Sequence, residues 1–268
     1  SASLRSHMAS PNAFLLTALA VIVLTTGCLG GGGPASGPAS TDASGASMSG
    51  ANPDEPLSVV SDLDAVLEDA GSYTAEWRLQ SQSSEQNRSV TTNRAMIDYT
   101  NERYHIRLAG QADGQPGGGM EAYHENGVTF RRVGGADDPA FMATEEAFDP
   151  TLQATIRPMA ATAGSLDGLE FTGTETYDGV SVRRYVMTDR ASWLRVQSQF
   201  DDEVDIRAFD YELLVDDAGL VRYERWHVVG VEEGSERTVT VEYSLTGVGS
   251  TTVTEPTWLS AARAQTGR

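Results

Sequence analysis

The hydrophobic and polar positions of the chain follow two periods, and the change from one to the other falls at Gly71. Apolar residues in 57–70 lie three and four positions apart, which predicts an amphipathic helix that ends at this glycine. From Tyr73 to Gln80, apolar and polar residues alternate instead. Alternation places every second side chain on one face, so we expect a strand with one buried face here.

Alternation continues through much of the remaining chain and predicts roughly ten strands in all. One hairpin is expected over 123–133, with its turn at Asn126-Gly127, and another turns at 216–219. Helices are expected over 150–163, where Pro158 kinks or ends the helix, and over 191–200. The other expected strands are 95–99, 104–108, 169–175, 180–188, 209–215, 220–231, 239–245 and 251–254. Because few strands are separated by helices long enough for parallel crossovers, the pattern predicts an α+β fold with an antiparallel sheet.

A short apolar segment precedes the single cysteine of the chain. Residues 13–24 form an apolar run that is shorter than the about 20 residues needed to span a bilayer and has the length of a signal-peptide core. The following Leu24-Thr25-Thr26-Gly27-Cys28 resembles the lipobox of secreted lipoproteins, although Thr25 stands where leucine or valine is commoner. The resemblance implies that residues 1–27 are a signal peptide and that Cys28 becomes the lipidated N-terminus. The alternative is a small buried apolar cysteine, which the four glycines of 30–33 disfavour.

The composition then changes to that of a linker. From Leu29 to Pro56, 22 of 28 residues are Gly, Ala, Ser, Thr or Pro, so we expect residues 28–56 to form a flexible tether behind the lipidated cysteine. Residues 57–262 are expected to form one domain, and residues 263–268 a C-terminal tail. The expected location is the extracellular face of the cell membrane, with the protein held there by the lipid on Cys28.

The net charge of the chain limits the classes of molecule that it can bind. The chain has 38 Asp and Glu residues against 19 Lys and Arg residues, a formal net charge of −19, and all its basic residues are arginines. Such a surface repels phosphates, which excludes nucleic acid as a partner and excludes electrostatic attachment to an anionic membrane. An acidic, lysine-free composition resembles that of haloarchaeal proteins, in which molar salt screens the repulsion between carboxylates. We therefore expect a salt-adapted protein.

No motif of catalytic or metal chemistry stands out. His105, His124 and His227 lack the spacing of metal ligands, and a Gly-x-Ser-x-Gly motif is absent from the sequence. Gly117–Gly119 are expected in a loop, so they do not predict a phosphate site. Asn87, in Asn87-Arg88-Ser89, is a candidate glycosylation site. We expect a non-enzymatic protein without a cofactor or a metal.

Four segments carry a resemblance to a known family: 63–73, 123–133, 213–222 and 248–259. A helix that leads into a Ser-Tyr strand, a long meander, an inserted helix and paired closing strands resemble the half-barrel of bacterial outer-membrane lipoprotein carriers. The same order is similar to mycobacterial lipoproteins that carry lipids and glycolipids, and the chain looks most like haloarchaeal lipoproteins built in this way. The resemblance implies a curved antiparallel β-sheet (half-barrel) covered by a few helices, with an apolar cavity on its concave face.

If the cavity is present, apolar residues of the concave face line it. The candidates are Tyr73, Trp77, Leu79, Tyr104, Ile106, Tyr211 and Leu213. The alternative is that these residues form a filled core between sheet and helix. The first interpretation predicts non-catalytic binding or carriage of a lipid or other hydrophobic ligand. The second predicts a structural or partner-binding cell-surface module that contacts an envelope protein through a sheet edge or its acidic face, and an enzyme without a recognisable motif is a third alternative.

Overall fold

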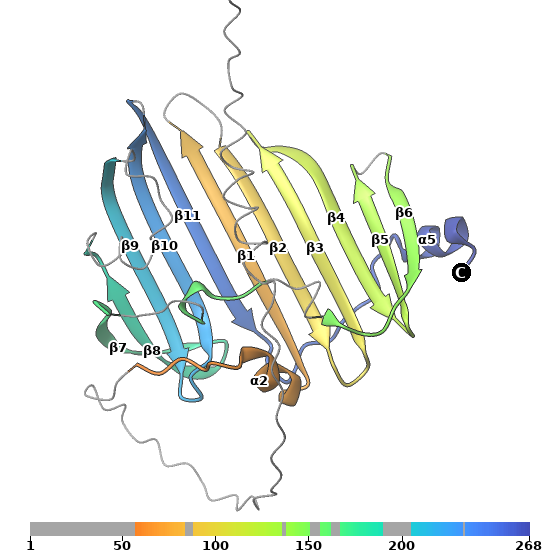
Figure 1. Cartoon of the computed structure of the whole chain (residues 1–268), viewed down its shortest axis with the longest axis horizontal. Coiled ribbons are helices and arrows are strands. Elements are labelled where there is room, and N and C mark those ends of the chain that lie inside the picture. Colours follow the sequence, from red (N-terminus) through yellow and green to blue (C-terminus); the bar gives the residue numbers. More distant parts are fainter. Residues whose placement is uncertain are drawn as a thin grey trace, which may run out of the picture. The chain divides into compact units, whose positions relative to one another are not determined.

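The computed structural model describes residues 57–83, 88–135, 138–150, 156–161, 167–189, 205–232 and 234–268 (Figure 1). All of them belong to one compact unit, residues 50–268. Their strands are β1 (Ser72–Ser83), β2 (Arg88–Asp98), β3 (Arg103–Ala112), β4 (Gln115–Glu125), β5 (Val128–Gly134), β6 (Ala140–Glu145), β7 (Glu170–Tyr177), β8 (Val180–Met187), β9 (Asp205–Asp216), β10 (Val221–Glu232) and β11 (Ser235–Thr246). Their helices are α2 (Leu63–Asp69), the 3-10 helix η1 (Met159–Ala161) and α5 (Leu259–Thr266).

The strands form one curved, open sheet in the order β6-β5-β4-β3-β2-β1-β11-β10-β9-β8-β7 (Figure 1). Every neighbouring pair is antiparallel, which confirms the antiparallel sheet predicted from the alternation. One meander runs from β1 to β6 and a second from β7 to β11, and the two join where β1 pairs with β11. β6 and β7 end the sheet, so the architecture is consistent with a half-barrel.

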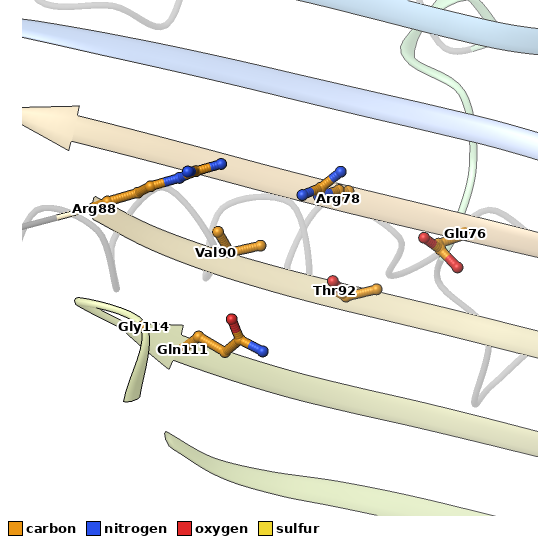
Figure 2. Close-up of a pocket in the computed structure, with 7 residues that line it drawn as sticks. All are labelled: Glu76, Arg78, Arg88, Val90, Thr92, Gln111 and Gly114. Carbon is orange, nitrogen blue, oxygen red and sulfur yellow. The ribbon is translucent and has the colours of Figure 1, made fainter. Parts of the chain in front are cut away.

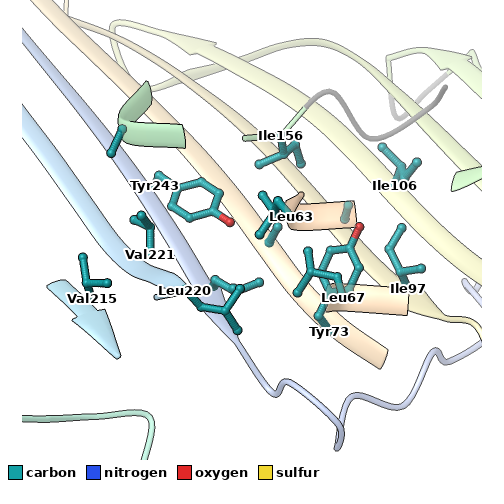
Figure 3. Close-up of a cluster of buried hydrophobic side chains, with 14 of the residues drawn as sticks. Leu63, Leu67, Tyr73, Ile97, Ile106, Ile156, Val215, Leu220, Val221 and Tyr243 are labelled. Atoms are coloured by element: carbon teal, nitrogen blue, oxygen red, sulfur yellow. The ribbon is translucent and has the colours of Figure 1, made fainter. Parts of the chain in front are cut away.

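The two faces of the sheet are covered by different parts of the chain. The inner face contains the register partners Tyr73 and Ile97, which share a core cluster with Leu63 and Leu67 of α2 (Figure 3). Tyr104, the register partner of Ile97 on β3, belongs to the same cluster. The outer face carries a smaller cluster beneath α5 and the segment before it. Among the described residues, the helical cover of the inner face is α2 and the single turn η1, which is less than the few helices expected.

The first helix is shorter than the predicted span of 57–70. It begins at Leu63 because the Asp62 carboxylate caps it, accepting a hydrogen bond of 3.1 Å from the Ala65 backbone N–H. The residues before it are not helical, and the Val60 backbone N–H donates to the Gly219 carbonyl at 2.9 Å. Val60 is nevertheless packed against the core. The apolar residues of this segment are therefore buried although the segment is not helical.

Two strands depart from the prediction in the middle of the chain. β4 begins at Gln115, so Gly117–Gly119 lie in a strand and not in a loop. A Cβ on Gly119 would lie 2.8 Å from the Leu108 carbonyl oxygen of β3, so the close approach of the two backbones requires a glycine there. β6 is absent from the prediction because none of its six residues is fully buried, which leaves a weak pattern.

Of the expected helix over 150–163, the structure describes Pro150, which is helical, and residues 156–161, which are not α-helical. Residues 156–158 are not helical and only the turn η1 follows. Pro158 explains the break, because proline lacks the N–H of a helical hydrogen bond and restricts the residue before it. Residues 151–155 and 162–166, and the expected helix over 191–200, lie outside the described residues.

The chain end also differs from the prediction. Residues 251–254 form no strand, since the Thr251 hydroxyl donates to the Gly247 carbonyl and lies 3.0 Å from the Thr74 hydroxyl. Val253 then packs into the outer-face cluster, and α5 follows. This helix includes residues 263–266, which the sequence analysis assigns to a tail.

Glu121 fixes the C-terminal segment to the outer face. Its carboxylate accepts hydrogen bonds from Trp258 Nε1 and Arg132 Nη1, both at 2.9 Å, and lies 3.1 Å from His105 Nε2. The hydrogen bond with His105 is the main cause that lowers the pKa of Glu121 to about 2. This part of the outer face is therefore occupied by the chain's own end and by paired charges.

The contact at Gly119 gives a direct test of the β3–β4 register. We expect Gly119→Ala to lower the free energy of unfolding by about 1–3 kcal/mol, because the new methyl group meets a backbone carbonyl that cannot move away freely. Gly118→Ala is the control, since a Cβ there meets no atom within 4 Å. Denaturant unfolding of both variants measures the difference, and equal stabilities would contradict this register.

Candidate functional site

One residue from each strand forms a continuous row across the inner face. Each member is the register partner of the next, so all eleven side chains lie on the same side of the sheet. From β7 to β6 this central row is Phe171, Tyr185, Leu213, Glu224, Tyr243, Trp77, Asn93, Leu108, Met120, Val133 and Ala140. It combines aromatic and aliphatic side chains with two polar ones near the middle.

Burial falls along the central row from one meander to the other. Leu213 and Tyr243 are 0% and 1% exposed, whereas Met120 and Val133 are each 38% exposed. Met142, in the next row of the same face, is 49% exposed. These three are the large hydrophobic side chains that stand exposed among the described residues, and all lie on the inner face of β4–β6. The apolar side chains of the inner face are thus buried on β8–β11 and partly exposed to solvent on β4–β6.

The structure places all seven candidate cavity residues on the inner face. Four of them belong to its closed core, and the other three are half-buried. The core members are Tyr73, Tyr104, Ile106 and Leu213, and the half-buried ones are Trp77, Leu79 and Tyr211. Cys28 and Asn87 lie outside the described residues. Met120, Val133 and Met142 are missed by the sequence analysis, because the glycines before Met120 and the short β6 hide the alternation there.

Glu224 is a carboxyl group inside the core of the inner face. It is 2% exposed and accepts hydrogen bonds from the Tyr211 hydroxyl at 2.9 Å and from the Ala160 backbone N–H at 3.3 Å. Burial raises its pKa to about 7, because the charged form loses its hydration there. The group therefore keeps its proton well above the pH at which an exposed glutamate ionises.

A short segment, residues 156–161, crosses the inner face as a strap. Besides the contact of Ala160 with Glu224 on β10, the Trp77 indole N–H donates to the Arg157 carbonyl oxygen at 2.9 Å. The Arg157 guanidinium donates to Asp64 of α2 at 2.6 Å. The strap is thus attached to β1, β10 and α2, and it covers the closed half of the face.

Three buried polar atoms near the middle of the inner face have no hydrogen-bond partner in the described structure: Tyr243 Oη, Asn93 Oδ1 and Trp226 Nε1. Tyr243 and Asn93 flank Trp77 in the central row, and Trp226 lies on β10 in the adjacent row. A buried polar atom without a partner costs about 1–3 kcal/mol, so three in one region are an unusual feature of a folded protein.

A second polar network lies at the α2 end of the same face. His124 is fully buried, and its Nδ1 lies 2.9 Å from the Thr129 hydroxyl. That hydroxyl is also 2.9 Å from the Tyr104 hydroxyl, and the ring of Tyr104 stacks on His124 at 5.2 Å. Burial lowers the pKa of His124, which favours the neutral ring. No cluster of metal-ligating side chains occurs among the residues that the structure describes.

A groove of about 430 Å³ lies on the outer face, away from these residues (Figure 2). It is lined by Glu76, Arg78, Arg88, Val90, Thr92, Gln111 and Gly114. Its arginines already have partners, since Arg88 donates to Gln80 at 2.8 Å and Arg78 lies 3.9 Å from Glu242. The groove is therefore polar and its arginines are paired, whereas the exposed large apolar side chains of the described structure lie on the inner face.

In the described part of the chain, no helix has the length and apolar character needed to cross a membrane.

The sequence matches the family of unknown function DUF7537 over residues 14–262. The chain belongs to this family. No curated protein matches it.

Solved structures with similar chains include three from bacteria. LprF from Mycobacterium bovis is 14% identical, with a TM-score of 0.33, over 74% of this chain and 98% of that one. A LolA superfamily protein from Nitrosomonas europaea is 8% identical, with a TM-score of 0.22, over 72% and 94% of the two chains. A β-barrel-like protein of the domain of unknown function DUF1849 from Brucella abortus is 9% identical, with a TM-score of 0.21, over 65% and 97%.

The buried Glu224 predicts a pH dependence of stability. The native state holds the Glu224 proton up to about pH 7, whereas the unfolded chain releases it near 4.5. The free energy of unfolding therefore decreases as the pH rises between these values, by up to about 3 kcal/mol. We expect Glu224→Gln to lack this decrease and Glu242→Gln, on the outer face, to keep it. Denaturant unfolding from pH 4.5 to 8 at constant salt measures the effect, and an unchanged profile in Glu224→Gln would contradict the assignment.

Proposed function

We propose that this protein binds or carries a lipid or another hydrophobic ligand on the inner face of its sheet, without catalysis. The observation that supports the proposal most strongly is the grouping of Met120, Val133 and Met142 on that face. Exposed apolar side chains gathered on one face mark a binding surface more often than chance exposure. Covering them with a hydrocarbon chain removes apolar surface from water, which contributes roughly 1 kcal/mol for each side chain.

The closed half of the face supports the same interpretation. α2 and the strap hold Tyr73, Leu213 and Tyr243 in a packed core, so this half provides a rigid wall. The half formed by β4–β6 lacks such cover among the described residues, and the apolar row continues into it through Leu108. A ligand lying along the row would extend the core onto the open strands.

The proposal includes the location of the protein. The apolar run 13–24 and the lipobox-like segment before Cys28 support a lipid anchor on the extracellular face of the cell membrane. The composition of residues 29–56 supports a flexible tether between that anchor and the sheet. A carrier held in this way would meet its ligand at the membrane surface.

A partner-binding surface module is the second candidate. β6 ends the sheet in the described part of the chain, and an end strand can pair with a strand of another protein. In that case the exposed Met142 of β6 would contact the partner rather than a ligand.

A matched pair of substitutions tests the binding face. The full chain is titrated with the hydrophobic fluorescent probe 1-N-phenylnaphthylamine. We expect Val133→Glu to weaken binding about tenfold or more, because it places a charge on the open apolar surface. Val90→Glu is the control, since it makes the same change on the outer face. Circular dichroism and denaturant unfolding verify that both variants fold.

Two outcomes would contradict the proposed function. Either the wild-type chain does not bind the probe, or both variants bind it as the wild type does. In the first case, pull-down with a synthetic β6-complementary strand peptide would favour the partner-binding module.

A further inference from the structure

The groove on the outer face has a floor of short side chains between longer polar ones. Val90 and Thr92 of β2 form the floor, with Gln111 of β3 on one side and Arg78 of β1 on the other (Figure 2). Arg88 lies at the end of the groove where β2 begins. The volume of about 430 Å³ falls in the range of pockets that hold small molecules.

The two guanidinium groups of the groove lie near one another. The Arg88 side chain extends along the groove toward Arg78 (Figure 2), and it donates to the Gln80 amide oxygen at 2.8 Å. Gln80 and Arg78 are successive outer-face residues of β1, so their backbone positions are roughly 7 Å apart. Each guanidinium is a long, planar fork of N–H donors, so one ligand group with several oxygen atoms can contact both.

The partners of these two arginines leave much of their charge uncompensated. Arg88 takes part in none of the ion pairs between described residues, and its guanidinium is bonded to the neutral amide of Gln80. Arg78 lies 3.9 Å from Glu242, which is a loose ion pair. The Glu242 carboxylate is also shared, because it accepts a hydrogen bond of 3.3 Å from the Tyr223 hydroxyl.

The acidic groups at the groove have partners of their own. Glu76 is the one carboxylate among the lining residues, and it lies 3.9 Å from Arg94, which is not part of the lining. Asp113, next to Gly114, accepts a hydrogen bond of 3.2 Å from the Arg88 backbone N–H. The lining thus contains two guanidinium groups and one carboxylate, although the whole chain has a formal net charge of −19. The groove is therefore locally positive on an acidic protein.

Close ion pairs occur elsewhere on the same face. Arg184 and Glu212 are 2.6 Å apart, and Arg132 and Glu121 are 2.9 Å apart. The chain has 38 acidic residues for 19 basic ones, so carboxylates are not scarce. Two arginines with weak partners in one groove therefore favour an anion from outside the chain. Molar salt screens repulsion beyond about 3 Å, so at high salt the contacts within the groove decide whether an anion binds.

From this groove we propose a second binding site, which holds an oxyanion between the guanidinium groups of Arg78 and Arg88. The ligand group is a phosphate or a carboxylate, because both present several oxygen atoms to a guanidinium fork. The Thr92 hydroxyl and the Gln111 amide line the same groove and provide further hydrogen-bond donors. The site lies on the face opposite to the proposed hydrophobic surface, so it adds to the proposed function and does not depend on it.

Inorganic phosphate is the probe that tests this site. The full chain is titrated at pH 7.5 and constant ionic strength, and Kd is measured from the broadening of the phosphorus NMR line. We expect saturable binding, and we expect Arg78→Gln and Arg88→Gln each to raise Kd about tenfold, because each removes a charged donor. Arg184→Gln is the control, since it makes the same change on the same face. The side chains of Arg78 and Arg184 are 44% and 43% exposed, so the two substitutions are also matched in exposure.

The class and the source of the anion follow from two further titrations. Acetate that displaces phosphate extends the site to carboxylates, and acetate without effect restricts it to phosphates. Cosedimentation with phosphatidylcholine vesicles, with and without phosphatidylglycerol, tests a lipid head group as the source. A preference for the anionic vesicles that Arg88→Gln abolishes assigns the phosphate to a lipid, and equal sedimentation assigns it to a free molecule.

The site is overturned if phosphate does not saturate the wild-type chain, or if all three arginine variants bind it as the wild type does. Its failure is distinguishable from the failure of the proposed function. Val90→Glu places a carboxylate on the groove floor, so it should abolish phosphate binding and keep binding of 1-N-phenylnaphthylamine. Val133→Glu on the inner face should have the opposite effects.

Discussion

The pairing of β1 with β11 is the constraint on which the rest of the structure depends. It joins residues 74–83 to residues 237–246, so it connects segments that are far apart in the chain. Without this contact the two meanders would be separate sheets, each with two open edges. The pairing also sets Tyr243 beside Trp77, which makes the central row continuous from β7 to β6. Because such long-range pairing closes a large loop, its entropic cost must be offset by the core that forms around it, where Ala75 and Leu245 are almost fully buried.

The sheet uses its two faces in different ways. On the outer face, charged groups are paired and the C-terminal helix covers the end of the sheet that contains β5 and β6, with Glu121 as the fixed point. On the inner face, a carboxyl group, a tyrosine hydroxyl and an indole N–H lie buried among apolar side chains, at a cost to stability. Folding alone would favour apolar residues at these positions. The open strands β4–β6 lie at the other end of the same row of side chains.

Alternation in the sequence predicts most of this sheet because one side of nearly every strand is buried. It identifies β1, the hairpin at Asn126-Gly127 and the strands β7–β11, and it places all seven candidate residues on one face. It fails where that signal disappears: Gly117–Gly119 have no side chains to alternate, β6 has no fully buried residue, and α5 is a short helix after Pro256 with a weak apolar stripe. Whether a residue on the inner face is core or open surface depends on which segment lies over it. Tyr104 and Met120 both lie on the inner face, and only the positions of α2, the strap and the register show that one is buried and the other exposed.

The central claim is that the inner face holds a hydrophobic molecule, and native mass spectrometry of the full chain tests it most directly. The protein is purified from its producing cells without detergent exchange and transferred to a volatile salt that keeps it folded. The account predicts an added mass on a single copy of the chain, which solvent extraction releases as a lipid or another hydrophobic molecule and which Val133→Glu retains less well. A chain that shows only its own mass, and that takes up no lipid from added extracts of the same cells, would contradict the account.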